Sequence, residues 1–250
     1  MSKVFCLFLF AIMSLLNAQN AAPLSDAAKM KSEEMNQNAA SFQAKRSDKG
    51  DFTILVYGNS ITLHEPAPQI GWNNNWGMAA SAPEKDYAHL VIAGMEAFRR
   101  QKAIFRIRNL YLLERNYREY DVAANLKEDI ALRPDYIVIA LGENVPVFAN
   151  AEDEKAYRDK LVVLAKAFQQ SEKKPVIVFR SPFWNNPLKS RLTKEAADMC
   201  GARFVEAGKL GDDDANKAIG LFEHQGVAGH PGDLGMKRLA EMILAALQEK

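Results

Sequence analysis

The stretch that decides the fold is Thr53-Ile54-Leu55-Val56-Tyr57, which runs directly into Gly58-Asn59-Ser60-Ile61-Thr62. A run of apolar, β-branched and aromatic residues that ends at a glycine is typical of a buried strand in a parallel sheet. Ser60 would then lie on the turn that leaves the carboxyl end of this strand. Open α/β sheets bind their ligands at that edge. The stretch therefore predicts a parallel sheet and a functional position at Ser60.

Downstream of this stretch, short β-rich segments alternate with helical segments. We expect strands at residues 53–57, 104–110, 136–141, 176–180 and 203–205, and helices at residues 86–100, 122–132, 152–170, 191–200 and 234–248. Such alternation is typical of a parallel sheet with helices on both faces. There is no internal repeat, so we expect a single α/β domain over residues 51–250.

The first 50 residues have a different character. Lys3 precedes an apolar run at residues 4–16, and Ala18 offers a small residue before a cleavage point, so residues 1–18 read as a signal peptide. The run is shorter than the ~20 residues of a spanning helix. Residues 19–50 are polar and read as a leader that could be helical. We therefore expect a secreted or periplasmic protein without a membrane span after processing.

Charge and cysteine content exclude several classes of function. The 32 basic and 31 acidic residues are interspersed, which argues against a nucleic-acid partner and leaves a small-molecule or glycan substrate as the expected partner. Cys200 is the only cysteine outside the predicted signal peptide, so neither an intrachain disulfide nor a cysteine-based zinc site is expected. His64, His89 and His224 lack a metal-binding spacing such as His-Glu-x-x-His, and we expect no metal.

A second informative motif, His230-Pro231-Gly232-Asp233, immediately precedes the last predicted helix. His230 would lie in the loop before that helix, at a point where the fold can bring it to Ser60. A serine hydroxyl becomes a good nucleophile only when a base removes its proton, and histidine is the usual base near neutral pH. The two motifs together indicate a serine hydrolase.

With these motifs the chain resembles the SGNH (GDSL-type) hydrolases. Gly58-Asn59-Ser60 matches the nucleophile block, normally Gly-Asp-Ser, and Gly142-Glu143-Asn144 matches the Gly-x-Asn block. His230 with Pro231 matches the terminal histidine block. The resemblance implies a three-layer α/β/α sandwich around a parallel, flavodoxin-like five-stranded sheet, with ester cleavage or acyl transfer that needs no cofactor.

The resemblance also implies a role for each matched residue. Ser60 would attack the ester carbonyl, and His230 would act first as general base and then as general acid. The side chain of Asn144 would serve the oxyanion hole, and Gly142 would belong to the oxyanion loop. Such a donor is commonly worth ~100–1000-fold in rate.

The chain departs from the family pattern around the histidine. Val227 occupies the position, three residues before His230, where the family has an aspartate that orients the imidazole. The orienting group is therefore missing, supplied from elsewhere, or replaced by a backbone carbonyl. Glu223 is the candidate for a side chain supplied from elsewhere, although its spacing from His230 is not that of the family.

Two further departures concern the nucleophile and the oxyanion hole. Asn59 replaces the usual aspartate before the serine, which keeps a turn-forming side chain without its charge. The family's glycine block after the second strand is not visible in residues 109–120. One oxyanion donor is therefore unassigned, and Arg115 or Asn116 is a candidate to line the site instead.

Two long connections, residues 63–85 and 181–188, are rich in aromatic residues and asparagine. Their tryptophans offer apolar faces that suit sugar rings, or else they pack the connections onto the domain. Arg180, at the end of a predicted strand, could bind a substrate carboxylate or cap a helix. The candidate substrate-binding residues are Asn59, Trp72, Trp76, Arg115, Asn116, Arg180 and Trp184.

Together these patterns lead us to expect a secreted esterase that removes short acyl groups, acetyl above all, from a carbohydrate. Two other classes remain open. The same serine and histidine could pass the acyl group to another sugar hydroxyl, which would make the protein a carbohydrate O-acyltransferase. Alternatively, Asn59, Val227 and the missing glycine block could mark a carbohydrate-binding domain that has lost catalysis.

Overall fold

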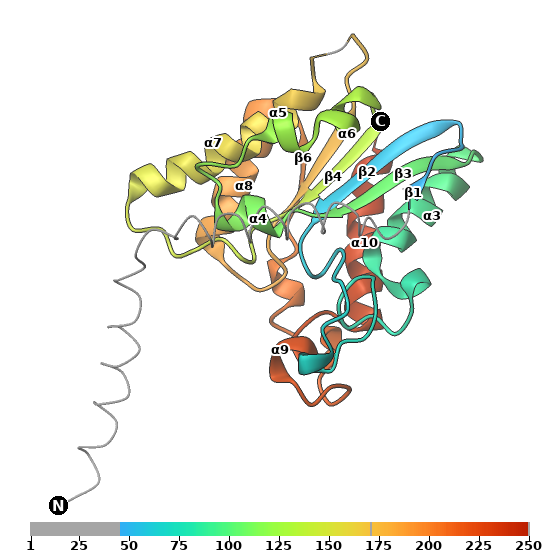
Figure 1. Ribbon diagram of the computed structural model, residues 1–250, viewed down its shortest axis with the longest axis vertical. Coiled ribbons are helices and arrows are strands. Elements are labelled where there is room, and N and C mark those ends of the chain that lie inside the picture. Colours follow the sequence, from blue (N-terminus) through green and yellow to red (C-terminus); the bar gives the residue numbers. More distant parts are fainter. Residues whose placement is uncertain (1–45, 171, 250) are drawn as a thin grey trace, which may run out of the picture. The chain divides into compact units, whose positions relative to one another are not determined.

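The computed structural model describes residues 46–170 and 172–249, so the predicted signal peptide and most of the leader lie outside the described residues. A six-stranded sheet in the order β1-β3-β2-β4-β5-β6 forms its centre (Figure 1). Five strands run parallel, and the short β1 pairs antiparallel with β3. The strands are β1 (Arg46–Ser47), β2 (Phe52–Gly58), β3 (Ala103–Asn109), β4 (Tyr136–Ala140), β5 (Val176–Arg180) and β6 (Arg203–Val205).

The predicted flavodoxin-like sheet of five parallel strands is confirmed, and in it β2 lies between β3 and β4. β1 was not predicted, since it falls within the stretch interpreted as the leader. It adds two residues to the outer edge of β3, where Ser47 pairs with Phe105. The connection between β1 and β2 is short, which brings the last residues of the leader back along the sheet.

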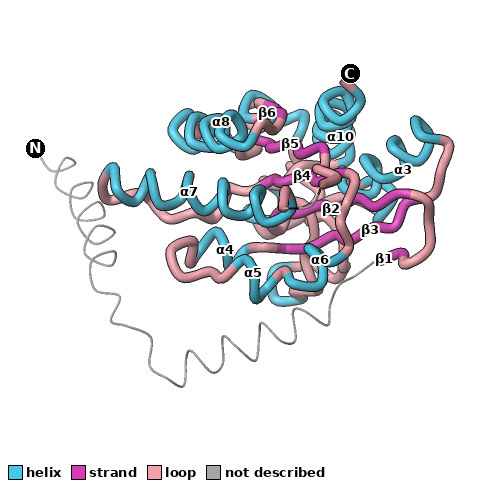
Figure 2. Tube along the Cα trace, turned by 90° about the horizontal axis from the view of Figure 1, so that it is seen from above, coloured by secondary structure: helices cyan, strands magenta, loops and turns pink. Residues whose placement is uncertain are grey.

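Helices cover both faces of the sheet, as the three-layer prediction requires (Figure 2). Helices α3 (Tyr87–Arg99) and α10 (Asp233–Gln248) pack together on one face. The opposite face carries α4 (Tyr111–Arg115), α5 (Val122–Asn125), α6 (Lys127–Ala131), α7 (Ala151–Phe168) and α8 (Pro187–Cys200). A further short helix, α9 (Gln225–Ala228), precedes α10, and 3-10 turns occur at η1 (Pro68–Ile70), η2 (Pro83–Lys85), η3 (Gly208–Leu210) and η4 (Asp214–Asn216).

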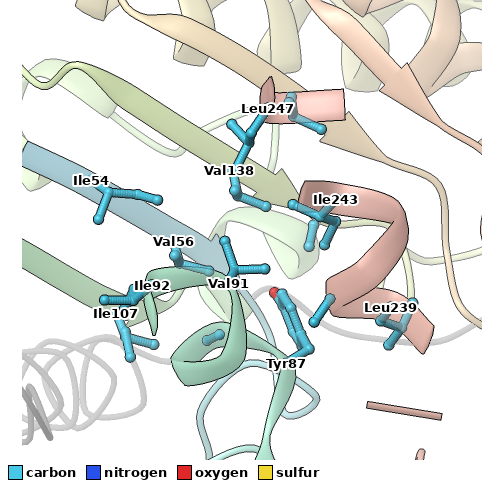
Figure 3. Close-up of a cluster of buried hydrophobic side chains, with 14 of the residues drawn as sticks. Ile54, Val56, Tyr87, Val91, Ile92, Ile107, Val138, Leu239, Ile243 and Leu247 are labelled. Atoms are coloured by element: carbon cyan, nitrogen blue, oxygen red, sulfur yellow. The ribbon is translucent and has the colours of Figure 1, made fainter. Parts of the chain in front are cut away.

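The alternation of side chains along β2 creates two cores. Ile54 and Val56 point to the face that α3 and α10 cover, where Figure 3 shows them among residues such as Val91 and Ile243. Leu55 and Tyr57 point to the face that α7 and α8 cover. All seven residues of β2 are buried, because both faces of a central parallel strand are covered.

The predicted helix over residues 122–132 is wrong in one respect, because Leu126 interrupts it between α5 and α6 with φ −118° and ψ 17°. The break accompanies a buried carboxylate at Asp129, which accepts hydrogen bonds from the Tyr57 hydroxyl at 2.8 Å and from Arg108 at 3.0 Å.

Among the described residues, no helix has the length and apolar character needed to cross a bilayer.

Candidate active site

Ser60 lies on a tight turn at the carboxyl end of β2. Backbone N–H groups of Thr62 and Leu63 both donate to the carbonyl of Asn59 at 2.9 Å, which closes the turn. The carbonyl of Ser60 accepts from the Met78 N–H at 2.9 Å, so the long insertion after the serine is fixed to the turn. Gly58 is required here, because a Cβ at this position would collide with the Thr62 hydroxyl. The turn therefore holds Ser60 in one place.

His230 approaches Ser60 from the loop before α10. Its Nε2 lies 2.8 Å from Ser60 Oγ, although 170 residues separate the two in sequence. Its other nitrogen, Nδ1, lies 2.6 Å from the backbone carbonyl oxygen of Gly226. A carbonyl only accepts, so Nδ1 carries the proton of the neutral ring and Nε2 presents a lone pair to the serine hydroxyl. This tautomer can take a proton from Ser60.

The orientation of His230 therefore comes from a backbone carbonyl. Glu223, the side-chain candidate, is exposed, and the two ring nitrogens of His230 are bonded to Ser60 and Gly226 instead. Val227 is completely buried in a small apolar cluster with Trp72, so the family's aspartate position has become part of the packing. The sequence left three alternatives for the group that orients His230: none, a side chain from elsewhere, or a backbone carbonyl. The contact in the structure is the one with a backbone carbonyl, that of Gly226.

The surroundings of His230 keep it neutral. Burial is the main cause that lowers its pKa to about 4, and His64 and His224 lower it further. Trp184 packs against the imidazole nearly at a right angle, with ring centroids 5.2 Å apart. Its indole N–H donates to the Gly229 carbonyl at 3.1 Å. The ring of Trp184 therefore helps to fix the histidine.

A buried glutamate, Glu114 on α4, lies behind the site. Its Oε1 accepts from the Gly142 N–H at 2.6 Å and from Asn59 Nδ2 at 3.1 Å, while its Oε2 accepts from Asn144 Nδ2 at 2.7 Å. Gly142 has φ +136°, and a Cβ at this position would meet the ring of Pro182. Only glycine tolerates this combination of backbone conformation and close contact. One carboxylate thus connects the turn before Ser60 with the loop of Asn144.

A second buried carboxylate, Glu143, lies next to the first. Its Oε2 accepts from Asn59 Nδ2 at 2.7 Å, and its Oε1 accepts from Arg180 Nη2 at 2.8 Å and from the Phe183 N–H at 2.9 Å. Burial, and then repulsion by Glu143, raise the pKa of Glu114. Asn59 donates to both carboxylates and so bridges them.

The structure corrects three substrate-binding predictions, those for Arg180, Asn59 and Trp72. Arg180 and Asn59 are both completely buried, so neither is exposed to a ligand; Arg180 Nη2 donates to Glu143, and Asn59 Nδ2 donates to Glu143 and Glu114. Trp72 is corrected for the same reason. It is completely buried, with its ring 6.0 Å from that of Trp76, and its N–H donates to the His64 carbonyl at 3.3 Å.

The other predicted substrate-binding residues lie nearer the surface. Trp76 is partly buried and donates to the Ala80 carbonyl at 2.9 Å. Arg115 and Asn116 are exposed, and Arg115 Nη1 donates to the backbone carbonyl of Asn144 at 3.3 Å. Arg115 therefore lies beside the Asn144 loop.

Glu114 was missed by sequence reasoning, which considered its neighbours Arg115 and Asn116. The signal was the absence of glycine in residues 109–120, which shows that this part of the site is built differently.

A second missed contact is the one that Asp233 makes with the long connection at residues 63–85. Asp233 accepts from the Ser81 N–H at 2.9 Å and from the Ser81 hydroxyl at 2.7 Å, which links the start of α10 to the segment after Ser60.

Neither the turn at Ser60 nor its surroundings present a metal-binding arrangement. No cluster of three or more His, Cys, Asp or Glu side chains suited to a metal occurs in the part of the chain that the structure describes. The site combines the Ser60 hydroxyl with the neutral imidazole of His230. Such a set is suited to acyl transfer through a serine.

No family model and no curated protein matches the chain. Among solved structures, an active-site mutant of a family two carbohydrate esterase from Clostridium thermocellum is 15% identical with a TM-score of 0.51, over 82% of this chain and 65% of that one. A GDSL-like lipase from Bacteroides ovatus is 14% identical with a TM-score of 0.49, over 80% and 99% of the two chains. An acetyl xylan esterase from Butyrivibrio proteoclasticus is 12% identical with a TM-score of 0.47, over 82% and 65%.

These comparisons bear on the fold. At 15% identity, the likeness to the Clostridium esterase extends to the backbone arrangement and no further. The present chain spans 65% of the length of that esterase. The fold is that of the SGNH (GDSL-type) hydrolases, as the sequence motifs predicted.

Proposed function

We propose that this protein is a serine esterase that removes short acyl groups, acetyl above all, from a carbohydrate ester. The observation that carries the proposal is the 2.8 Å contact between Ser60 Oγ and His230 Nε2, with the ring tautomer fixed by the Gly226 carbonyl. A hydroxyl paired in this way with a neutral imidazole is the arrangement of an activated nucleophile.

The reaction would proceed in two halves. Ser60 Oγ attacks the ester carbonyl carbon as its proton passes to His230 Nε2, and the proton is then delivered to the departing sugar alcohol. Water attacks the acyl-serine in the second half, with His230 again taking a proton. The oxyanion formed in each half is stabilised by N–H donors, for which Asn144 and the backbone near Ser60 are the candidates.

Three features support a carbohydrate as the substrate. A hollow of about 610 Å³ lies between residues 68–71 and residues 221–224, segments that follow Ser60 and precede His230. This volume lies in the range of small-molecule sites. A solved structure with a similar fold is a family two carbohydrate esterase. The signal-like residues 1–18 fit a secreted or periplasmic enzyme that meets glycans outside the cytoplasm.

The test is hydrolysis of p-nitrophenyl acetate by the wild-type protein, Ser60→Ala and His230→Ala. We expect turnover in the wild type and a loss of about 10⁴-fold or more in both variants, because the two residues act as a unit. A fluorophosphonate should attach to Ser60, which peptide mass spectrometry would locate. Equal rates in all three proteins would disprove the role of Ser60.

Acetylated xylan and acetylated cello-oligosaccharides then identify the natural reaction. Acetate released into water indicates an esterase, whereas transfer to an added sugar exceeding release would indicate an O-acyltransferase. Glycan binding that is the same in wild type and Ser60→Ala, with no turnover of any ester, would indicate a carbohydrate-binding domain.

A further inference from the structure

We propose that Glu114 is the positioning residue of the oxyanion hole, and that it acts by holding Asn144 through paired hydrogen bonds to a buried carboxylate. The inference rests on the proposed esterase function and adds a residue to its machinery. Glu114 is completely buried on α4, beneath the loop that follows β4. It occupies the stretch in which the family resemblance leads one to expect a glycine.

The geometry requires a carboxylate at this position. Oε1 faces the Gly142 N–H at 2.6 Å, and Oε2 faces Asn144 Nδ2 at 2.7 Å. Both partners are donors, so both oxygens must accept. A glutamine at residue 114 would place its NH₂ against the Gly142 N–H in one orientation and against the Asn144 NH₂ in the other. A side chain of the same size as glutamate but with an NH₂ group therefore cannot accept from both donors.

The hold on Asn144 leaves one donor free for chemistry. A side-chain NH₂ has two N–H bonds, and Glu114 engages Asn144 Nδ2 from one side. The backbone N–H of Asn144 also points to Glu114 Oε1, at 3.4 Å. With main chain and side chain both directed at one carboxylate, the remaining N–H has a fixed direction. A preorganised donor of this kind stabilises an oxyanion without reorganising during the reaction.

Asn59 connects the two buried glutamates, which explains why asparagine stands here in place of the aspartate of the family's Gly-Asp-Ser block. Its NH₂ donates to Glu114 Oε1 at 3.1 Å and to Glu143 Oε2 at 2.7 Å, while its Oδ1 accepts from the Ile61 N–H at 3.2 Å. An aspartate would give three adjacent buried carboxylates, of which Glu143 is paired with Arg180. The amide of Asn59 is therefore the counterpart that the two glutamates require.

The experiment is a double-mutant cycle with Glu114→Gln and Asn144→Ala, measuring kcat and KM for p-nitrophenyl acetate. We expect Glu114→Gln to lower kcat by about 10–100-fold with little change in KM, since a displaced oxyanion donor acts on the transition state. In a protein that already carries Asn144→Ala, Glu114→Gln should lower kcat by less than about 3-fold. The effects of two residues that act through one another are not additive. Glu119→Gln, an exposed site shortly after α4, is the matched control and should be neutral.

Each result separates this inference from the proposed function. An unchanged kcat in Glu114→Gln, or an equal loss with and without Asn144, would overturn the positioning role while leaving the esterase intact. Circular dichroism and thermal unfolding establish whether the variant folds. If it does not, Glu114→Asp provides the comparison, because it keeps the charge but withdraws the oxygens from Asn144, and kcat should again fall with KM unchanged. A wild-type protein inactive on every ester overturns both proposals.

Discussion

His230 Nδ1 lies 2.6 Å from the carbonyl oxygen of Gly226, four residues earlier in the chain. A carbonyl fixes the tautomer as a carboxylate would, but it brings no full negative charge to stabilise the imidazolium. Burial is the largest cause that lowers the pKa of His230 to about 4. The site therefore holds a weak base that is ready at almost any pH, where a carboxylate would give a stronger one.

Restoring the family's aspartate should harm the protein. Val227→Asp would place a carboxylate in the apolar cluster around Trp72, where Val227 is completely buried. We expect a loss of about 3–5 kcal/mol in the free energy of unfolding, as for other unpaired buried charges. Val227→Thr, which adds only a hydroxyl, should lose about 1–3 kcal/mol. Urea unfolding of both variants measures whether Val227→Asp loses more stability than Val227→Thr. A Val227→Asp protein that is active and as stable as the wild type would contradict the packing role.

The pH dependence of kcat/KM should have an acid limb that depends on Glu114. His230 acts as a base, so with its pKa near 4 it alone would give a rate that rises with pH through about 4 and is level above. Burial and Glu143 raise the pKa of Glu114, and its protonation would break the hold on Asn144. Activity should therefore fall on acidification before His230 is protonated.

Other charged groups around Glu114 set the position of this limb. Arg180 on β5 and Lys189 on α8 both interact electrostatically with it. In Glu114→Gln the limb should move down toward pH 4, since only His230 then titrates. Stopped-time assays in overlapping buffers measure this, and identical limbs in the two proteins would refute the assignment.

Asn59→Asp should destabilise the protein and remove activity. The substitution replaces a donor by a third carboxylate between Glu114 and Glu143, and we expect a loss of about 3 kcal/mol or more. Asn150→Asp is the matched control, because the Asn150 side chain caps α7 through its oxygen and aspartate caps equally well. Thermal unfolding of both variants tests the contrast. Similar melting temperatures for the two would show that the amide of Asn59 is dispensable.

Trp184 should matter for catalysis more than for substrate affinity. Its ring packs against His230 with centroids 5.2 Å apart. We expect Trp184→Ala to lower kcat by about 10-fold, because a small displacement of the base is costly. Trp184→Phe keeps an aromatic contact and should lose less. A change confined to KM in both variants would instead indicate that Trp184 binds substrate.

The sequence was most informative where local pattern and position in the fold agree. The apolar run of β2 and the strand at Val176–Arg180 were predicted because buried parallel strands are continuous and apolar. The short strand at Arg203–Val205 was also predicted. The motifs around Ser60 and His230 could be placed for the same reason, since they follow a strand and precede a helix.

The missed features depend on contacts between distant segments. Glu114 looked like one more charged residue in a polar stretch, and nothing local indicates that α4 turns it inward beneath the Gly142 loop. Arg180 could not be distinguished from a ligand-binding arginine until its buried partner, Glu143, was known. Trp72 likewise belongs to a satellite cluster with Val227, from a segment about 150 residues away in sequence.

The separation of Ser60 from His230 along the chain has a consequence for biosynthesis. The serine and its turn emerge early during translation, whereas the imidazole arrives only with the segment that leads into α10. Because α10 packs on α3 and against β5 and β6, the histidine reaches the serine only after this last helix has docked. On the proposed mechanism, a chain whose last helix has not docked therefore carries a Ser60 hydroxyl without its base, and catalysis would begin only when folding is complete.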